Sequence, residues 1–239
     1  MTGDIVYGRR AVHEALRGRR EVLELWATER AVKSEPWLAE ARARLKAERE
    51  LSELAGTRDH QGVVARTEPF RYADAYELAR AERPLLAVLD RVTDPRNLGA
   101  VCRSADGAGA TGVVVPAHGS AVVTPAVARA SAGAVEHVGV AVVPNLARYL
   151  EDVKGADLWV YGAAGGAGAG ARPMWETDLS GGAALVFGAE GKGLRPLVRR
   201  TCDALVSIPM HGRVESLNVS VAAALILYEA RRQRLERAE

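Results

Sequence analysis

Six short apolar segments follow one another in the chain after Pro84, separated by amphipathic or polar stretches. They are residues 85–90 (LLAVLD), 111–116 (TGVVVP), 138–143 (VGVAVV), 157–162 (DLWVYG), 183–188 (AALVFG) and 203–209 (DALVSIP). Strands this uniformly apolar are typical of a parallel sheet whose two faces are both covered by helices. The pattern therefore predicts a doubly wound α/β domain over residues 84–239.

Residues 1–67 have a different pattern, in which short amphipathic segments alternate with apolar ones. Segments 8–19 and 36–54 predict helices, and segments 22–28 and 60–67 predict strands. Residues 68–83 are polar and bounded by proline, which predicts a linker with a helical turn or two. The expected organisation is a small α/β domain at 1–67, a linker at 68–83 and a larger α/β domain at 84–239.

The last apolar run, residues 219–228, contains a single polar residue, Ser220, and predicts a helix buried on all sides. Its front edge nevertheless carries Glu215, Ser216 and Asn218. Polar groups that lead directly into a core helix are compatible with a helix cap and with a functional site.

Composition and charge exclude few classes of protein. The chain has 239 residues, is 48% hydrophobic and 26% charged, and has a formal net charge of +2. These values suit a globular protein and name no partner. Arginines gather near the N-terminus, at Arg9, Arg10, Arg19 and Arg20. Such a patch suits binding to an RNA or DNA backbone, and equally suits a solvated helix face.

Two cysteines, Cys102 and Cys202, lack metal-ligand spacing, so no metal site is expected. Free cysteines are typical of a reducing cytoplasm. No apolar run reaches the length of about 20 residues that spans a membrane, and the N-terminus has no apolar signal core. The expected location is therefore the cytoplasm.

Two glycine-rich segments resemble nucleotide-binding loops without meeting their requirements. Gly166, Gly168 and Ala171 have the spacing of a dinucleotide fingerprint, but Arg172-Pro173 follows where a helix should begin. The segment 188–194 (GAEGKGL) fails the phosphate-loop pattern. A nicotinamide dehydrogenase or a nucleoside triphosphatase is thus disfavoured.

Three predicted strand ends carry polar residues that could form a functional site. They lie in segments 85–109, 184–194 and 204–220, and they present Asn97 with Arg103, Glu190, and Ser216 with Asn218. The carboxyl ends of strands are where open α/β sheets bind ligands, so the three are expected to form one site. Asn97 stands where a helix N-cap belongs. Each of these residues taken alone is also compatible with a simple cap or turn.

Two further residues near these ends have alternative interpretations. Cys102 adjoins Arg103 and could be an activated nucleophile, although a small buried residue is the simpler interpretation. His211 could act as a base, but no partner is visible in the sequence.

Taken together, the three segments resemble the three motifs of the SpoU/TrmH branch of the SPOUT methyltransferases. The motifs are DPRNLGAVCRSADGAG, LVFGAEGKGL and SIPMHGRVESLNVSVAAALILYE. YGRRAVHEAL and HQGVVAR resemble the ends of that family's L30e-like substrate-binding domain, and NLARYL at 145–150 is also similar. The resemblance implies a SPOUT α/β-knot domain with a C-terminal trefoil knot at 84–239, preceded by an L30e-like RNA-binding domain at 1–67.

The resemblance also implies a cofactor, a reaction and a partner. S-adenosylmethionine would contact the chain around Gly188, Ala189, Gly191, Ile208, Met210 and Leu217. Arg103 would act as base or as an electrostatic clamp during 2′-O-methylation of a guanosine in 23S rRNA. Asn97, Glu190, Ser216 and Asn218 would fix Arg103 and the ribose, and the enzyme would be a homodimer through the knotted domain.

Two alternatives remain open at this point. The first is 2′-O-methylation of a tRNA or of another rRNA nucleotide; the separate N-terminal domain favours rRNA. The second is an RNA-binding knot protein without catalysis, which the presence of all five motif residues disfavours.

Overall fold

The computed structural model describes residues 3–155, 157–165, 170–189 and 191–237, which fold as two compact units. Unit 1 consists of Met1–Arg71 with Val123–His137, and unit 2 of Tyr72–Val122 with Val138–Glu239. The sequence predicts a domain at 1–67, a linker at 68–83 and a second domain at 84–239. It does not predict that residues 123–137 pack with the N-terminal residues.

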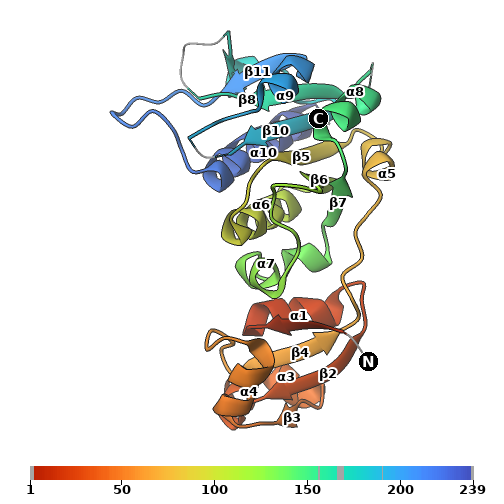
Figure 1. Cartoon of the computed structure of the whole chain (residues 1–239), viewed down its shortest axis with the longest axis vertical. Coiled ribbons are helices and arrows are strands. Elements are labelled where there is room, and N and C mark those ends of the chain that lie inside the picture. Colours follow the sequence, from red (N-terminus) through yellow and green to blue (C-terminus); the bar gives the residue numbers. More distant parts are fainter. Residues whose placement is uncertain (1–2, 156, 166–169, 190, 238–239) are drawn as a thin grey trace. The chain divides into compact units, whose positions relative to one another are not determined.

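Unit 1 is built on a four-stranded sheet in the order β1-β4-β2-β3, in which β4 is antiparallel to both neighbours and β2 and β3 are parallel (Figure 1). The strands are β1 (Asp4–Tyr7), β2 (Val22–Ala27), β3 (Arg44–Leu45) and β4 (Val63–Thr67). The helical segments are α1 (Arg9–Arg17), α2 (Glu29–Ser34), α3 (Pro36–Glu40), α4 (Glu48–Ala55), α7 (Pro125–Ala130) and η1 (Ala134–Glu136). Trp26, Leu51 and Val64 form a core cluster between sheet and helix α4.

The long helix predicted over residues 36–54 is wrong. The chain leaves α3 at Arg42, whose φ is +54°, and β3 then pairs with β2 before α4 begins. The side chain of Glu50 accepts a hydrogen bond from the Ala47 amide at 3.0 Å and so starts α4. Strand pairing and this cap satisfy backbone groups that a continuous helix would have satisfied internally, so tertiary contacts override the local helix propensity.

Unit 2 contains a seven-stranded sheet in the order β7-β6-β5-β10-β8-β11-β9, and every recorded strand pair in it is parallel. The strands are β5 (Leu85–Asp90), β6 (Gly112–Pro116), β7 (Gly139–Val143), β8 (Trp159–Ala163), β9 (Arg172–Pro173), β10 (Ala183–Gly188) and β11 (Ala204–Ser207). All six strands predicted from the apolar segments are present. The seventh, β9, is a two-residue strand that the sequence pattern does not reveal.

Helices cover both faces of this sheet, as the doubly wound prediction requires (Figure 1). Alternate side chains of β5 and β10, such as Leu86 and Val186, pack with Leu150 and Val198 of the helices on one face. Those helices are α5 (Ala75–Ala79), α8 (Leu146–Val153) and α9 (Pro196–Thr201). On the other face α10 (Val219–Glu236) packs against α6 (Pro95–Gly107), β10 and β5, and η2 (Met174–Glu176) lies beside α10.

The predicted linker is largely absorbed into the two units. The Phe70 amide donates to Asp4 in unit 1 at 2.7 Å, and the Ala73 amide donates to the Val140 carbonyl in unit 2 at 2.8 Å. The Tyr149 hydroxyl donates to the Ala75 carbonyl at the start of α5. The change of unit therefore occurs over a few residues after Phe70.

Helix α10 is not buried on all sides in the single chain. Ala223, Ile226 and Leu227 are buried, whereas Val221, Leu225 and Tyr228 are 46%, 41% and 52% exposed. The exposed residues recur at intervals of four and three and therefore form one stripe along the helix. The reason is geometric: the sheet and α6 cover one side of α10 and leave the opposite side open.

In the described part of the chain, none of the helices is both long enough and apolar enough to cross a membrane. The predicted glycine-alanine loop falls partly on residues 166–169, which lie outside the described residues.

Candidate functional site

The first predicted strand end opens helix α6, but its N-cap differs from the prediction. The cap is Asp94, whose carboxylate accepts from the Arg96 amide at 2.8 Å, and Pro95 occupies the first helical position. Hydrogen bonds from Arg96 hold the pKa of the Asp94 carboxyl below its usual value. Asn97 therefore lies inside the first turn, and its side chain is not needed to cap α6.

Asn97 contacts the third predicted strand end instead. The side-chain nitrogen of Asn218 donates to the side-chain oxygen of Asn97 at 3.0 Å, across 121 positions of sequence. The Asn218 oxygen caps α10 by accepting from the Ser220 amide at 2.9 Å and from the Ser220 hydroxyl at 2.6 Å. The polar front edge of α10 thus serves both as a helix cap and as a bridge to α6.

Arg103 and Ser216 are both exposed in unit 2. Arg103 lies in the third turn of α6, and no ion pair to it is recorded within the part of the chain that the structure describes. Ser216 belongs to the exposed run 211–218, which leads into α10. Glu190, the remaining predicted catalytic residue, lies outside the described residues. A guanidinium that has no carboxylate partner among the described residues is suited to bind an external anion.

The second strand end is a loop that folds back on itself after β10. A Cβ atom on Gly188 would lie 2.1 Å from the carbonyl carbon of Gly193, so only glycine permits this approach. The Gly193 amide donates to the Ala189 carbonyl at 2.9 Å and closes the loop. Gly191 and Gly193 have φ of +72° and +62°, a region that favours glycine. The glycines predicted to cradle a cofactor are therefore required by the loop itself.

The segment after β11 offers backbone groups to a ligand. Ile208 and Met210 are half-buried and Leu217 is 36% exposed. Outside helices and strand ladders, no backbone–backbone hydrogen bond is recorded for residues 208–217 among the described residues. Backbone amide and carbonyl groups of an exposed loop can bind the polar edges of a cofactor. Three residues of the predicted cofactor set, Ile208, Met210 and Leu217, lie on this segment.

One functional pair was missed by the sequence analysis. Asp90, the last residue of β5, is fully buried, and its carboxylate accepts from the Arg195 Nε at 2.6 Å and from the Arg195 amide at 2.8 Å. Arg195 ends the glycine loop 188–194, so the pair ties that loop to the first strand end. The sequence does contain a signal for this pair: the charged Asp90 ends an otherwise apolar run.

The two cysteines have the inert environment of small buried residues. Burial raises the pKa of the Cys102 thiol to about 12, and burial together with the nearby Asp203 raises that of Cys202 to about 12. Neither thiol is a nucleophile at neutral pH. His211 is exposed, and no cluster of three metal-ligating side chains occurs within the described residues.

The N-terminal arginines divide into two groups. Arg10 and Arg19 are exposed, and Arg9 is partly exposed while pairing with Glu35 at 3.1 Å. Arg20 is buried, and its guanidinium pairs with Glu136 at 2.7 Å and with Asp4 at 3.1 Å. The prediction that Arg20 binds RNA is therefore wrong, because its donors already serve the interior of unit 1.

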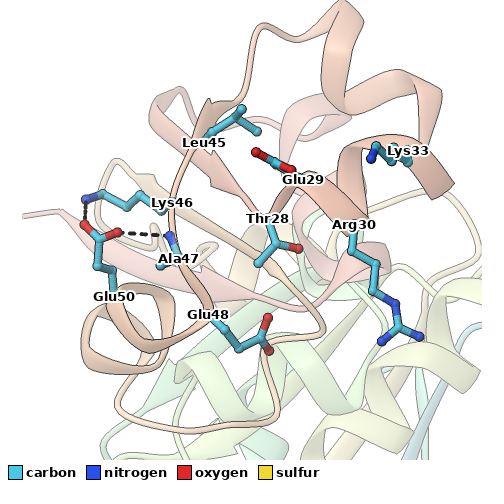
Figure 2. Close-up of a pocket in the computed structure, with 9 residues that line it drawn as sticks. All are labelled: Thr28, Glu29, Arg30, Lys33, Leu45, Lys46, Ala47, Glu48 and Glu50. Carbon is cyan, nitrogen blue, oxygen red and sulfur yellow. Dashed lines mark hydrogen bonds and ion pairs between the residues drawn. The ribbon is translucent and has the colours of Figure 1, made fainter.

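Unit 1 also contains a cavity of about 750 Å³ between α2 and the start of α4 (Figure 2). Its lining includes three cations, Arg30, Lys33 and Lys46, and three carboxylates, Glu29, Glu48 and Glu50. Figure 2 shows Lys46 bonded to Glu50, at 2.7 Å. Because the charges balance, this cavity is a poor site for a phosphate backbone.

Comparisons with known proteins place both units of the chain in described families. Residues 84–228 match the SpoU rRNA Methylase family, and residues 5–73 match the family described as RNA 2′-O ribose methyltransferase substrate binding. The chain is 44% identical to the 23S rRNA (guanosine-2′-O-)-methyltransferase RlmB of Pseudomonas putida, over 96% of both chains. It is 40% identical to RlmB of Shewanella oneidensis, over 97% of this chain and 98% of the relative.

Among solved structures, the chain resembles the SpoU methyltransferase AviRb from Streptomyces viridochromogenes in complex with the cofactor AdoMet. The TM-score is 0.80 at 30% identity, with 97% of this chain and 90% of that chain covered. The likeness spans both units, so it includes the N-terminal residues as well as the three strand ends.

Proposed function

The chain belongs to the SpoU rRNA methylase family, and from this premise we propose that it methylates the ribose 2′-hydroxyl of a guanosine in 23S rRNA. The methyl donor is S-adenosylmethionine. The observation that carries the proposal is the contact between Asn97 and Asn218, because it unites two family motifs 121 positions apart at one edge of the sheet. The relatives named for this reaction match nearly the whole chain, which favours 23S rRNA over tRNA.

The cofactor would be held mainly by backbone groups. The glycine loop at Gly188, Ala189 and Gly191 and the segment from Ile208 through Met210 to Leu217 supply them. When bound, S-adenosylmethionine provides an electrophilic methyl group on a sulfonium. Asp90 holds Arg195, and through it the glycine loop, in the position that binding needs.

Arg103 would act on the RNA and not on the cofactor. An arginine remains protonated at any working pH, so we assign it an electrostatic role. It would hold the target phosphate and stabilise the negative charge that develops on the 2′-oxygen as the hydroxyl releases its proton to solvent. Asn97, Asn218 and Ser216 would orient the ribose, and Glu190 completes this proposed set. Alignment of hydroxyl and methyl supplies much of the rate enhancement.

Unit 1 would select the RNA. Arg10 and Arg19, with Arg9 beside them, present positive charge that phosphate contacts need. Phosphate contacts alone do not discriminate between sequences, so unit 1 would recognise RNA shape and unpaired bases.

The exposed stripe of α10 supports a homodimer. Val221, Leu225 and Tyr228 form one exposed, largely apolar stripe along α10, which a second copy of the chain would cover. Replacing Leu225 with Glu should yield a monomer in sedimentation experiments. Leu16→Glu, at a 37% exposed position of α1, should leave the assembly unchanged.

We also assign the C-terminal part of unit 2 to the trefoil knot of the SPOUT fold, and the enzyme to the cytoplasm. The knot is supported by the position of β11 between β8 and β9 and by the return of α10 to α6 after an eleven-residue connection, 208–218. The location is supported by the reaction itself, since 23S rRNA and the cofactor meet there, and by two free cysteines.

The test is methyl transfer from labelled S-adenosylmethionine to undermethylated 23S rRNA, 16S rRNA and bulk tRNA. We expect label in 23S rRNA, on a guanosine ribose. Label mainly in tRNA would favour the alternative substrate, methyl groups on a base would show that the chemistry is different, and cofactor binding without any transfer would indicate a non-catalytic RNA-binding protein.

Arg103→Ala should lower single-turnover methyl transfer by about 10²-fold or more while leaving cofactor affinity unchanged, because its guanidinium faces RNA chemistry only. Arg103→Lys should also fail, since lysine lacks the planar fork. Arg80→Ala is the control: Arg80 is exposed in the same unit and pairs with Glu77. Transfer by Arg103→Ala within a few-fold of wild type would refute the assignment.

A further inference from the structure

A second cavity, of about 320 Å³, lies at the carboxyl edge of the sheet in unit 2. We call it the edge pocket. Its lining comes from the segments that follow the strands: Arg91 lies after β5, His118 after β6 and Asn145 after β7. Arg195 and Leu197, at the start of α9, complete this part of the lining. The chain runs from β5 outward to β7 and then crosses to β8 and β10 on the other side of β5. The pocket thus borders the point where the strand order reverses, a place where α/β proteins bind ligands.

The charge of the edge pocket differs from that of the unit 1 cavity. Its lining contains two arginines and a histidine, and among the described residues it contains no aspartate or glutamate. Arg195 is held by the buried Asp90, while Arg91 is exposed and has no recorded ion pair within the described residues. A pocket lined in this way is suited to an anion.

Arg91 is held in an uncommon backbone conformation that directs it to the pocket. Its φ is +62°, in the left-handed region that non-glycine residues rarely adopt. The turn after β6 is bonded to the same place, since the Ala121 amide donates to the Val92 carbonyl at 2.8 Å. A Cβ atom on Gly119 would lie 3.6 Å from the Arg91 Nε, so the guanidinium rests beside the turn that carries His118.

The remaining walls are apolar. Pro116, Leu146 and Val198 are buried or nearly so, and Leu197 is 55% exposed at the rim. An apolar wall beside cations accommodates a sugar or base together with its phosphate. The volume is at the lower end of the range for small-ligand pockets, and so suits one nucleotide unit and not a larger cofactor.

We propose that the edge pocket binds one phosphate and its adjoining ribose in the RNA substrate, at a nucleotide other than the one that is methylated. This inference rests on the proposed function. It adds an RNA contact on unit 2, whereas the sequence predicts phosphate binding at the N-terminal arginines of unit 1. Arg91 and His118 contact the phosphate, and Leu197 packs on the ribose. Arg195, paired with Asp90, forms part of the wall.

Arg91→Gly is the informative variant, because glycine removes the guanidinium and tolerates the positive φ. With undermethylated 23S rRNA as ligand, we expect the dissociation constant to rise three- to tenfold. Loss of one phosphate contact should reduce the slope of log affinity against log salt by roughly 0.7 to 0.9. Leu197→Glu, which introduces a carboxylate at an exposed position, should weaken binding more than tenfold. Cofactor affinity by calorimetry should stay at the wild-type value in both.

Arg80→Ala is again the matched control and should bind RNA as the wild type does. Unchanged RNA affinity and salt slope in Arg91→Gly would overturn the proposal. A second result would also overturn it: micromolar guanosine 5′-monophosphate displaces RNA from the wild type but not from Arg91→Gly. The edge pocket would then be a site for free nucleotide. If wild-type protein fails to methylate 23S rRNA yet Arg91→Gly still weakens RNA binding, the proposed reaction is wrong and the edge pocket stands.

Discussion

At the scale of single residues, Asn218 uses the two ends of one amide for two purposes. Its oxygen caps α10 and its nitrogen bonds Asn97. Asn218→Ser should keep a competent cap but no longer reach Asn97, so thermal stability should change little while single-turnover activity falls by about 10²-fold through misalignment.

Two companion variants separate the roles. Asn97→Ala should reproduce the activity loss, and the double variant should be no worse than either single one, because both remove the same contact. Asn218→Ala should in addition lose roughly 0.5 to 2 kcal/mol of stability with the cap. Near-normal activity of Asn218→Ser would show that the bridge is structural only.

The buried thiols make a prediction about pH. Folding raises the pKa of Cys102 and of Cys202 from the ordinary value of a thiol to about 12, chiefly through burial. Because the unfolded chain releases these protons first, the stability they contribute is fully present below about pH 8.5 and is lost as the pH rises toward 12. Denaturant titrations at pH 8 and pH 10 should show a larger drop for wild type than for a Cys102→Ala/Cys202→Ala double variant. Equal drops would contradict the burial argument.

At the scale of elements, the loop between β10 and α9 depends on a glycine for close approach. Gly188→Ala places a methyl group 2.1 Å from the Gly193 carbonyl carbon, and backbone atoms cannot move aside as a side chain can. The loop must open, so we expect at least tenfold weaker binding of S-adenosylmethionine by calorimetry. Gly181→Ala, in the same unit with nothing within 4 Å of the new atom, is the control. Normal affinity in Gly188→Ala would mean that this loop does not hold the cofactor.

At the scale of the whole molecule, the ion pair between Arg20 and Glu136 joins the N-terminal residues to a segment more than one hundred positions away. The two side chains are 7% and 1% exposed. Arg20→Ala leaves a buried carboxylate without a partner and should cost roughly 3 to 5 kcal/mol of unfolding free energy.

The matched test replaces both partners. Arg20→Met with Glu136→Met should recover most of that stability, because no buried charge remains. Arg10→Ala, at an exposed position, should leave the melting temperature unchanged but weaken RNA binding. A stable Arg20→Ala protein with a reduced salt slope would restore Arg20 to the RNA-binding set.

The sequence by itself determined the elements whose signal is local. Six apolar runs predict six strands of unit 2, all of which are present, and three long motifs indicate the family and its reaction. Alternation and apolarity over a few residues decide whether a strand can be buried, and a motif of ten or more residues is specific enough to identify chemistry.

Only the tertiary structure decided what depends on distant partners. It broke the predicted helix 36–54 by pairing β3 with β2, and it brought Asn97 to Asn218. It buried Arg20 against Glu136, tied Asp90 to Arg195, and exposed one stripe of α10. Each of these outcomes rests on a contact between residues far apart in the sequence, or on which side of an element is covered. Short-range periodicity carries no information about either, because the free energy of such contacts exists only once the chain has been brought together.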